Sequence, residues 1–195
     1  MIIKKRIKNW LLVVVTSLLG LVPACNESAT TVELLDISSA QTVKQSLPVG
    51  TSVAVIDRWQ VEDFDKDIVQ FETVFWEAED SVSLRKLIRE TNLVQGKRVL
   101  EIGTGTGLIS LCCLQAGARV VVATDINPQA VANAQYNCSQ LDMPSTTEKF
   151  DVRLVDADNS GAFAVIASNE QFDVIISNPP WEDGEVQKVA DYAFI

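Results

Sequence analysis

The sequence predicts an α/β fold built on a parallel sheet with helices on both faces. Short runs rich in valine and isoleucine alternate with longer runs of helical periodicity between residues 98 and 177. Such alternation is typical of parallel sheets, because two parallel neighbours must be joined by a crossover connection. A glycine-rich turn joins the first strand of this region to its first helix, and 47% of the residues are hydrophobic, which is enough for a packed core.

Residues 1–25 have the pattern of a targeting segment. Four basic side chains among the first eight residues precede the largely apolar run 10–22, which is the layout of a secretory signal and predicts an N-terminal apolar helix. The run is short for a membrane-spanning helix, which needs about 20 apolar residues. Ala24-Cys25 resembles the end of a bacterial lipoprotein signal. We interpret 1–25 as a signal or anchor segment, with a buried helix as the alternative, and the polar stretch 26–50 as a linker.

Residues 51–75 predict a small β-hairpin that precedes the main fold. The β-branched run 51–59 is followed by an acidic turn and a second short run, 68–75. Asp80 or Ser81 can cap the next helix, in which Leu84, Leu87 and Ile88 recur at helical spacing. Gly96 ends this helical stretch.

The remaining elements alternate as far as residue 177. We expect strands over 98–102, 119–124, 151–155 and 172–177, helices over 108–116 and 128–141, and a helical patch near 162–169. Residues 51–195 are therefore interpreted as one domain.

Charge and residue types exclude several kinds of function. The formal net charge of −10 would repel a polyphosphate, which disfavours non-specific nucleic-acid binding. The chain has no histidine, so a histidine base and histidine-bound zinc are excluded. The four cysteines lack the C-x-x-C spacing of zinc or redox sites, and no metal site is predicted. Cys112 and Cys113 are expected on a buried helix as small apolar residues.

The run from Glu101 to Gly107, Glu-Ile-Gly-Thr-Gly-Thr-Gly, indicates a ligand at a strand-to-helix turn. Glycines there allow a tight turn and a close approach of the backbone to a small molecule. The spacing does not fit a dinucleotide, because counting G-x-G-x-x-G from Gly103 puts Leu108 at the last glycine position.

The same run resembles motif I of the class I S-adenosylmethionine-dependent methyltransferases, which have a Rossmann-like sheet. In that family an acid ends the first strand, and a carboxylate that ends the second strand binds the ribose hydroxyls of the donor. Asp125 stands at the second place, and a carboxylate can accept both hydroxyl hydrogens. Asp156, with Asp158 as the competing choice, would accept the adenine amino group, although both also fit the pattern of ordinary loop acids. The cofactor S-adenosyl-L-methionine would thus be held by Glu101, Gly103, Thr104, Gly105, Gly107, Asp125, Ile126 and Asp156.

The fourth strand of the region ends in Asn178-Pro179-Pro180-Trp181, which we take as the catalytic motif. It matches the [D/N]-P-P-[F/Y/W] signature of methyltransferases that modify planar nitrogens. The Asn178 side-chain oxygen and the Pro179 carbonyl would accept the two N–H bonds of an amide or aromatic amine, and positioning of this kind is worth several kcal/mol. The rigid turn would keep these acceptors free, and Trp181 would stack on the acceptor. An ordinary proline turn is the alternative.

Residues 74–81 add a further match. They resemble the segment that precedes motif I in release-factor glutamine methyltransferases and adenine amino-methyltransferases, the HemK-like small-domain group, although Ala78 departs from its pattern. The resemblance would place Glu79 and Asp80 near the donor, while a helix N-cap explains the same acids. A complete class I sheet has seven strands, three of them after the N-P-P turn, yet only residues 182–195 follow it here. The sheet is therefore expected to be incomplete and the protein to be truncated at its C-terminus.

These features together predict methyl transfer to a planar amide or amino nitrogen. The acidic charge favours a protein or small-molecule acceptor over nucleic acid. One alternative is a non-catalytic donor-binding module tethered to a membrane through residues 1–25, and a second is an adenine or guanine N-methyltransferase of nucleic acid. The targeting segment predicts a membrane-associated or exported protein, which conflicts with a methyl donor that is made in the cytoplasm.

Overall fold

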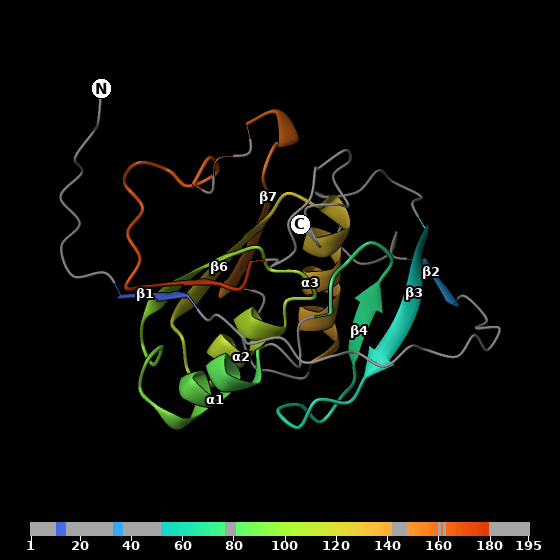
Figure 1. The fold of residues 1–195 in the computed structure, drawn as a ribbon, viewed down its shortest axis with the longest axis horizontal. Helices are drawn as coiled ribbons and strands as arrows, with labels where there is room; N and C mark the ends of the chain where they lie inside the picture. The colour runs from blue at the N-terminus through green and yellow to red at the C-terminus, as the bar shows by residue number, and fades with distance from the viewer. Residues whose placement is uncertain are drawn as a thin grey trace.

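The computed structural model describes residues 52–76, 81–141, 148–159, 161 and 163–179, and the backbone of 11–14 and 33–36. These residues form a five-stranded sheet, a three-stranded sheet and three α-helices (Figure 1). The order of the larger sheet is β1-β8-β5-β6-β7, and all of its pairings are parallel. The parallel sheet predicted from the sequence is confirmed.

The strands of the larger sheet lie close to their predicted positions. β5 (Arg98–Ile102) is central, β6 (Val120–Asp125) and β7 (Phe150–Leu154) follow on one side, and β8 (Val174–Ser177) lies on the other. β5 and β6 are apolar over most of their length and buried, as strands of a parallel sheet covered on both faces must be.

The edge of the larger sheet next to β8 is occupied by β1 (Leu11–Val14). The sequence predicted a helix over 10–22, and for these four residues that prediction is wrong. A short apolar run has no periodicity that separates a buried strand from a helix, and the unpaired edge of β8 offers hydrogen bonds to a strand. The rest of 1–25, and the linker 26–50 apart from 33–36, lie outside the described residues.

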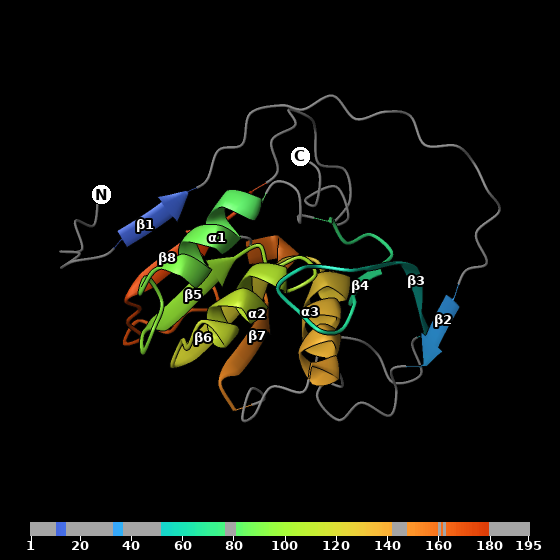
Figure 2. The ribbon, with the colours of Figure 1, turned by 90° about the horizontal axis from the view of Figure 1, so that it is seen from below.

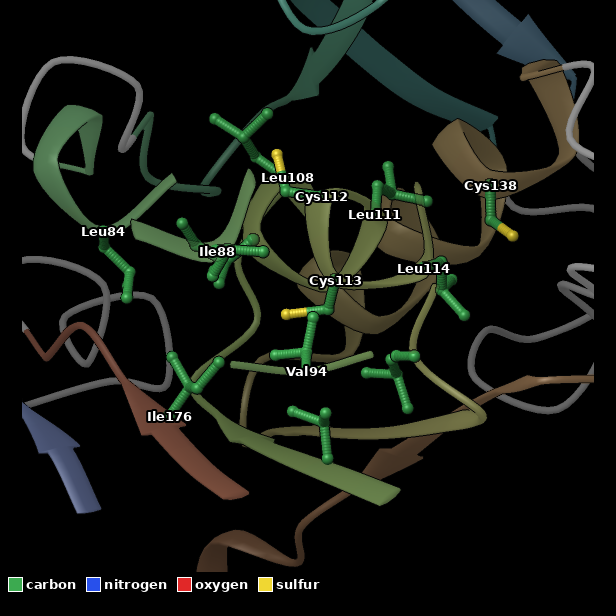
Figure 3. Close-up of a cluster of buried hydrophobic side chains, with 14 of the residues drawn as sticks. Leu84, Ile88, Val94, Leu108, Leu111, Cys112, Cys113, Leu114, Cys138 and Ile176 are labelled. Atoms are coloured by element: carbon green, nitrogen blue, oxygen red, sulfur yellow. The ribbon is translucent and has the colours of Figure 1, made fainter. Parts of the chain in front are cut away.

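Helices α1 (Val82–Glu90), α2 (Leu108–Gln115) and α3 (Pro128–Gln140) lie on the same face of the larger sheet (Figure 2). The main core lies between these helices and that face, where the sulfur atoms of Cys112 and Cys113 are buried among leucine, isoleucine and valine side chains (Figure 3). The expectation that these cysteines act as small apolar residues is confirmed.

The opposite face is covered by the connection from β7 to β8. Phe172 and, partly buried, Ile166 pack against Leu100, Val122 and Ile175. The helical patch predicted near 162–169 is wrong, since the described residues there, 163–169, form turns, and a 3-10 turn (Ala157–Asn159) precedes them. Side chains far along the sequence hold this connection, because Arg153 and Arg98 both pair with Glu170. In the described ranges, helices thus cover only one face.

The smaller sheet is antiparallel, with the order β2-β3-β4. It consists of β2 (Glu33–Asp36), β3 (Ser52–Trp59) and β4 (Ile68–Phe71). β3 and β4 form the predicted hairpin, which packs on α3 through Val53, Val69 and Phe71 (Figure 1).

Helix α1 begins where it was predicted, but without the predicted capping hydrogen bond. Ser81 occupies the N-cap, but its hydroxyl makes no capping hydrogen bond and instead accepts from Arg85 Nε at 3.2 Å. Among the described residues, no helix is both long and apolar enough to cross a bilayer.

Candidate functional site

The candidate residues meet at one edge of the larger sheet because its strands are parallel and in register. Ile102, near the end of β5, pairs with Thr124 of β6 on one side and Ser177 of β8 on the other. Three neighbouring strands therefore end side by side: β5 at the glycine turn, β6 at Asp125 and β8 just before Asn178. Ligands of open α/β sheets bind at such carboxyl ends.

The glycine turn has a backbone that only glycine adopts readily. Gly103, Gly105 and Gly107 have φ values of +77°, +53° and +86°. A Cβ on Gly107 would lie 2.9 Å from Cα and Cβ of Ala134, so α3 packs directly on the turn. No atom of the described residues lies within 4 Å of a Cβ built on Gly103, which leaves space among them above the end of β5.

Most of the turn's amide groups are used inside the protein. The N–H groups of Gly103 and Thr104 donate to the Thr124 carbonyl at 2.9 and 3.1 Å. Gly105 N–H donates to Asp125 Oδ2 at 3.0 Å, and Gly107 N–H to the Thr104 carbonyl at 2.8 Å. A pyrophosphate needs such amides for itself, so the turn is a poor cradle for a dinucleotide.

Glu101 belongs to β5, and its side chain reaches the first turn of α2, where a phosphate would otherwise bind. The residue is 3% exposed, and Oε2 accepts from Thr104 Oγ1 at 2.8 Å and from the Ser110 hydroxyl. Burial raises the pKa of Glu101 to about 7, against the opposing effect of these two hydroxyl donors. Above a pH of about 7 the ionised carboxylate repels anions and attracts cations.

Asp125 is held in place by two backbone groups. Oδ1 accepts from Asn127 N–H at 2.9 Å and Oδ2 accepts from Gly105 N–H. Burial raises the pKa of Asp125, while these backbone donors lower it. A carboxylate oxygen can accept more than one hydrogen bond, so Asp125 can also accept a ligand hydroxyl. Together with Glu101, this makes the site acidic and suited to a polyhydroxylated, positively charged ligand.

The third predicted acid is less engaged with the turn. Asp156 is exposed beyond the end of β7, and its Oδ1 accepts from Asp158 N–H at 2.9 Å, which starts the 3-10 turn. This local turn is the ordinary role considered for the pair, and Asp156 keeps a second oxygen outside it. Ile126 is half-buried between Asp125 and Asn127.

Asn178 and Pro179 leave the sheet directly beside the glycine turn. Ser177, which precedes them, pairs with Ile102 and donates its hydroxyl to the Ile102 carbonyl at 3.1 Å. Asn178 is half-buried and Pro179 exposed. The other predicted residues, Pro180, Trp181, Glu79 and Asp80, lie outside the described residues.

Sequence reasoning missed two residues of this site. Asn127 caps α3 by accepting from Gln129 N–H at 3.0 Å, and the pair Asn127-Pro128 is a helix-start signal that could have revealed it. Ser110, a partner of Glu101, is nine residues away in sequence and has no such signal. Within the described ranges, no group of three potential metal ligands occurs.

Comparison with known proteins finds similarity to methyltransferases. Residues 67–194 match the family model described as methyltransferase small domain. A protein of Methanocaldococcus jannaschii, assigned as a protein N5-glutamine methyltransferase, is 36% identical over 125 residues, which are 62% of this chain and 56% of that protein. The tRNA1(Val) (adenine(37)-N6)-methyltransferase of Shewanella loihica is 33% identical over 49% of this chain and 38% of its own length.

Other similarities are to ribosomal protein L11 methyltransferases. That of Burkholderia ambifaria is 28% identical over 69% of this chain and 43% of that protein. The crystal structure of the L11 methylase from Lactobacillus delbrueckii superimposes with a TM-score of 0.40 at 24% identity, over 53% of this chain and 48% of that protein. The chain thus spans roughly half the length of the curated relatives it matches.

Proposed function

Because residues 67–194 match its model, the chain belongs to the methyltransferase small domain family, and from this premise we propose that it is an S-adenosylmethionine-dependent N-methyltransferase. The observation that carries the proposal is the carboxylate of Glu101 at the N-terminus of α2. In that position it excludes the phosphates of a dinucleotide and favours a ligand with a sulfonium and an ammonium group.

The described residues fit this donor. Gly103 leaves room for the backbone to be approached, Asp125 can accept from ribose hydroxyls, and Glu101 supplies the negative charge. The donor would supply an electrophilic methyl group on its sulfonium. The chain's own residues would bind and orient: Asn178 would accept an N–H of the planar acceptor beside the glycine turn.

Donor binding is tested by calorimetry with S-adenosylhomocysteine. We expect saturable heat from the chain, and at least tenfold weaker binding by Asp125→Asn, which loses one of its charged acceptors. Asp151→Asn, which removes an exposed carboxylate at the other end of the sheet, should bind as the parent does. No heat from the parent protein would refute the proposal and favour the non-catalytic alternative.

For the acceptor, we propose a protein side chain rather than nucleic acid. The net charge of −10 and the similarity to a protein N5-glutamine methyltransferase support this choice, while the similarity to a tRNA adenine methyltransferase supports the alternative. Radiolabelled donor should label a lysate in a form that protease removes and nuclease does not. Asn178→Ala should abolish the label and still bind S-adenosylhomocysteine. Label removed by nuclease would overturn the choice of acceptor, and label from Asn178→Ala would overturn the role of that residue.

We also propose that residues 1–25 direct the protein to a membrane or for export, as their pattern predicts. Strand β1 is a competing use of the same apolar run, because Leu11–Val14 pair with β8. Mass spectrometry of the expressed protein separates the two. Cleavage near Cys25 or a lipid on Cys25 supports targeting, and an intact N-terminus in the soluble fraction supports the strand.

A further inference from the structure

Strand β4 has an outer edge that helix α3 covers in place of a strand. β3 pairs with its inner edge, and α3 runs along the other (Figure 2). Two asparagines one helical turn apart, Asn133 and Asn137, face this edge and are 0% and 1% exposed. Buried side-chain amides of this kind must be hydrogen-bonded to be tolerated.

The two asparagine side chains bond to β4 as a neighbouring strand would. Asn137 Oδ1 accepts from Val69 N–H and Asn133 Oδ1 from Phe71 N–H, both at 2.9 Å. Their Nδ2 groups donate to the Val69 carbonyl at 2.9 and 2.8 Å. Asn137 Nδ2 also lies 2.9 Å from the carbonyl of Thr106 in the glycine turn. A single asparagine therefore joins the hairpin to the donor turn.

A third asparagine makes a second connection at the other end of α3. Asn127 Nδ2 donates to the Thr73 carbonyl at 2.8 Å, while its own N–H donates to Asp125 Oδ1. Thr73 has a φ of +61°, a conformation that a β-branched residue adopts only when its surroundings impose it. Asn127 thus holds the chain where it leaves β4, and the same residue orients the carboxylate of Asp125.

Residues 74–76, the exit of the hairpin, are fixed from the other side as well. The Val74 carbonyl accepts from Gln70 Nε2 at 2.7 Å, and Gln70 Oε1 accepts from Trp59 Nε1 at 2.9 Å. The rings of Trp59 and Trp76 stack, with centroids 4.8 Å apart and planes 10° apart. The exit is therefore bonded to side chains of both hairpin strands.

We propose that Asn127 is a positioning residue that registers the β3–β4 hairpin on the donor site, so that residues 69–76 become more rigid when the donor binds. The inference rests on the proposed function, because it presupposes that the donor binds at Asp125. Donor hydroxyls would hold the carboxylate of Asp125. This carboxylate accepts the N–H of Asn127, and Asn127 Nδ2 donates to the Thr73 carbonyl, so the restraint would reach the hairpin. Asn137 would transmit the same restraint from Thr106 to Val69.

A serine at position 127 separates this role from ordinary helix capping. Asn127→Ser keeps an oxygen that caps α3 about as well as asparagine does, but loses the donor to the Thr73 carbonyl. Asn127→Ala loses both, so its difference from Asn127→Ser measures the capping contribution. Ser139→Ala is the matched control, because it removes a polar side chain from the same helix at its exposed far end.

The measurement is amide hydrogen exchange by mass spectrometry, with and without saturating S-adenosylhomocysteine. We expect the ligand to slow exchange in both 101–107 and 69–76 of the parent protein and of Ser139→Ala. In Asn127→Ser, melting should stay near the parent temperature, the response of 69–76 should be lost, and binding should weaken roughly five- to tenfold, the usual effect of one net hydrogen bond.

Each other outcome overturns the inference. Slower exchange in 101–107 alone, or an unchanged response in Asn127→Ser, would refute the coupling and leave the proposed function standing. Rescue of both binding and response by serine would reduce Asn127 to a helix cap. No ligand effect anywhere in the protein would refute the proposed function and the coupling together.

Discussion

Replacing Glu101 by glutamine should make the folded protein more stable at neutral pH while it weakens donor binding. Burial raises the pKa of Glu101 from 4.5 to about 7. The folded protein therefore keeps a proton between these pH values that the unfolded protein has released, so stability falls as pH rises from 4.5 to about 7. A shift of one pKa unit is worth about 1.4 kcal/mol, so the whole shift of Glu101 lowers the free energy of unfolding by about 3 kcal/mol.

Glutamine has no such proton to lose and still offers an oxygen to Thr104 and Ser110. The free energy of unfolding of Glu101→Gln, minus that of the parent, should thus rise by about 3 kcal/mol between pH 4.5 and 8. Urea unfolding at pH 5, 6, 7 and 8 measures this difference, and the other carboxylates largely cancel because both proteins share them. Parallel pH curves for the two proteins would refute the burial argument.

The same substitution tests the role of the charge in donor binding. The ammonium group of S-adenosylhomocysteine favours an ionised carboxylate beside it, so the affinity of the parent for this ligand should rise with pH through about 7. Glu101→Gln should bind more weakly than the parent at pH 8 and show no such rise. Equal affinity of the two proteins at pH 8 would remove Glu101 from the donor site.

Three further results are expected from the described structure. Gly107→Ala should lower the free energy of unfolding by roughly 1–3 kcal/mol in urea titrations, because its Cβ would lie 2.9 Å from α3 at a φ of +86°. Hydrogen bonds from Arg153 lower the pKa of Glu170 to about 2, so Glu170 stabilises the fold above pH 4.5 and loses this effect as pH falls towards 2. Glu170→Gln should therefore cost roughly 1–2 kcal/mol at pH 7 and flatten the acid side of the stability curve. Burial raises the pKa values of Cys112 and Cys113, so peptide mapping should find both unlabelled by iodoacetamide at pH 8 in the folded protein, and labelling of either would contradict their burial.

The fold was predictable where local patterns and the parallel sheet agree. β5 was predicted with its observed bounds, and α2 and α3 to within one residue at their C-terminal ends, because strand ends and helix starts carry their own signals in glycine and proline. The covering of the opposite face was not predictable. Apolar residues around 162–169 allow a helix, but Glu170 pairs with Arg98, 72 residues away, and ties the connection down as turns.

In the candidate site, too, some features were predictable from the sequence and others were not. The positions of Glu101, Asp125 and Asn178 follow from the sequence, since each stands at or just beyond the carboxyl end of a strand and parallel strands bring such ends together. The partners of Glu101 and the bonding of β4 to α3 did not follow. Phe71 and Asn133 are 62 residues apart, and no local pattern links them.

The sequence by itself determined the glycine turn after the central strand and predicted a small ligand there, because the residues that shape that turn are neighbours in the chain. Only the tertiary structure decided that most of the turn's amide groups are bonded inside the protein, and that Asn137 joins the hairpin to the turn. Both depend on hydrogen bonds between residues far apart in the sequence: the turn bonds to the Thr124 carbonyl, and Asn133 and Asn137 bond to strand β4.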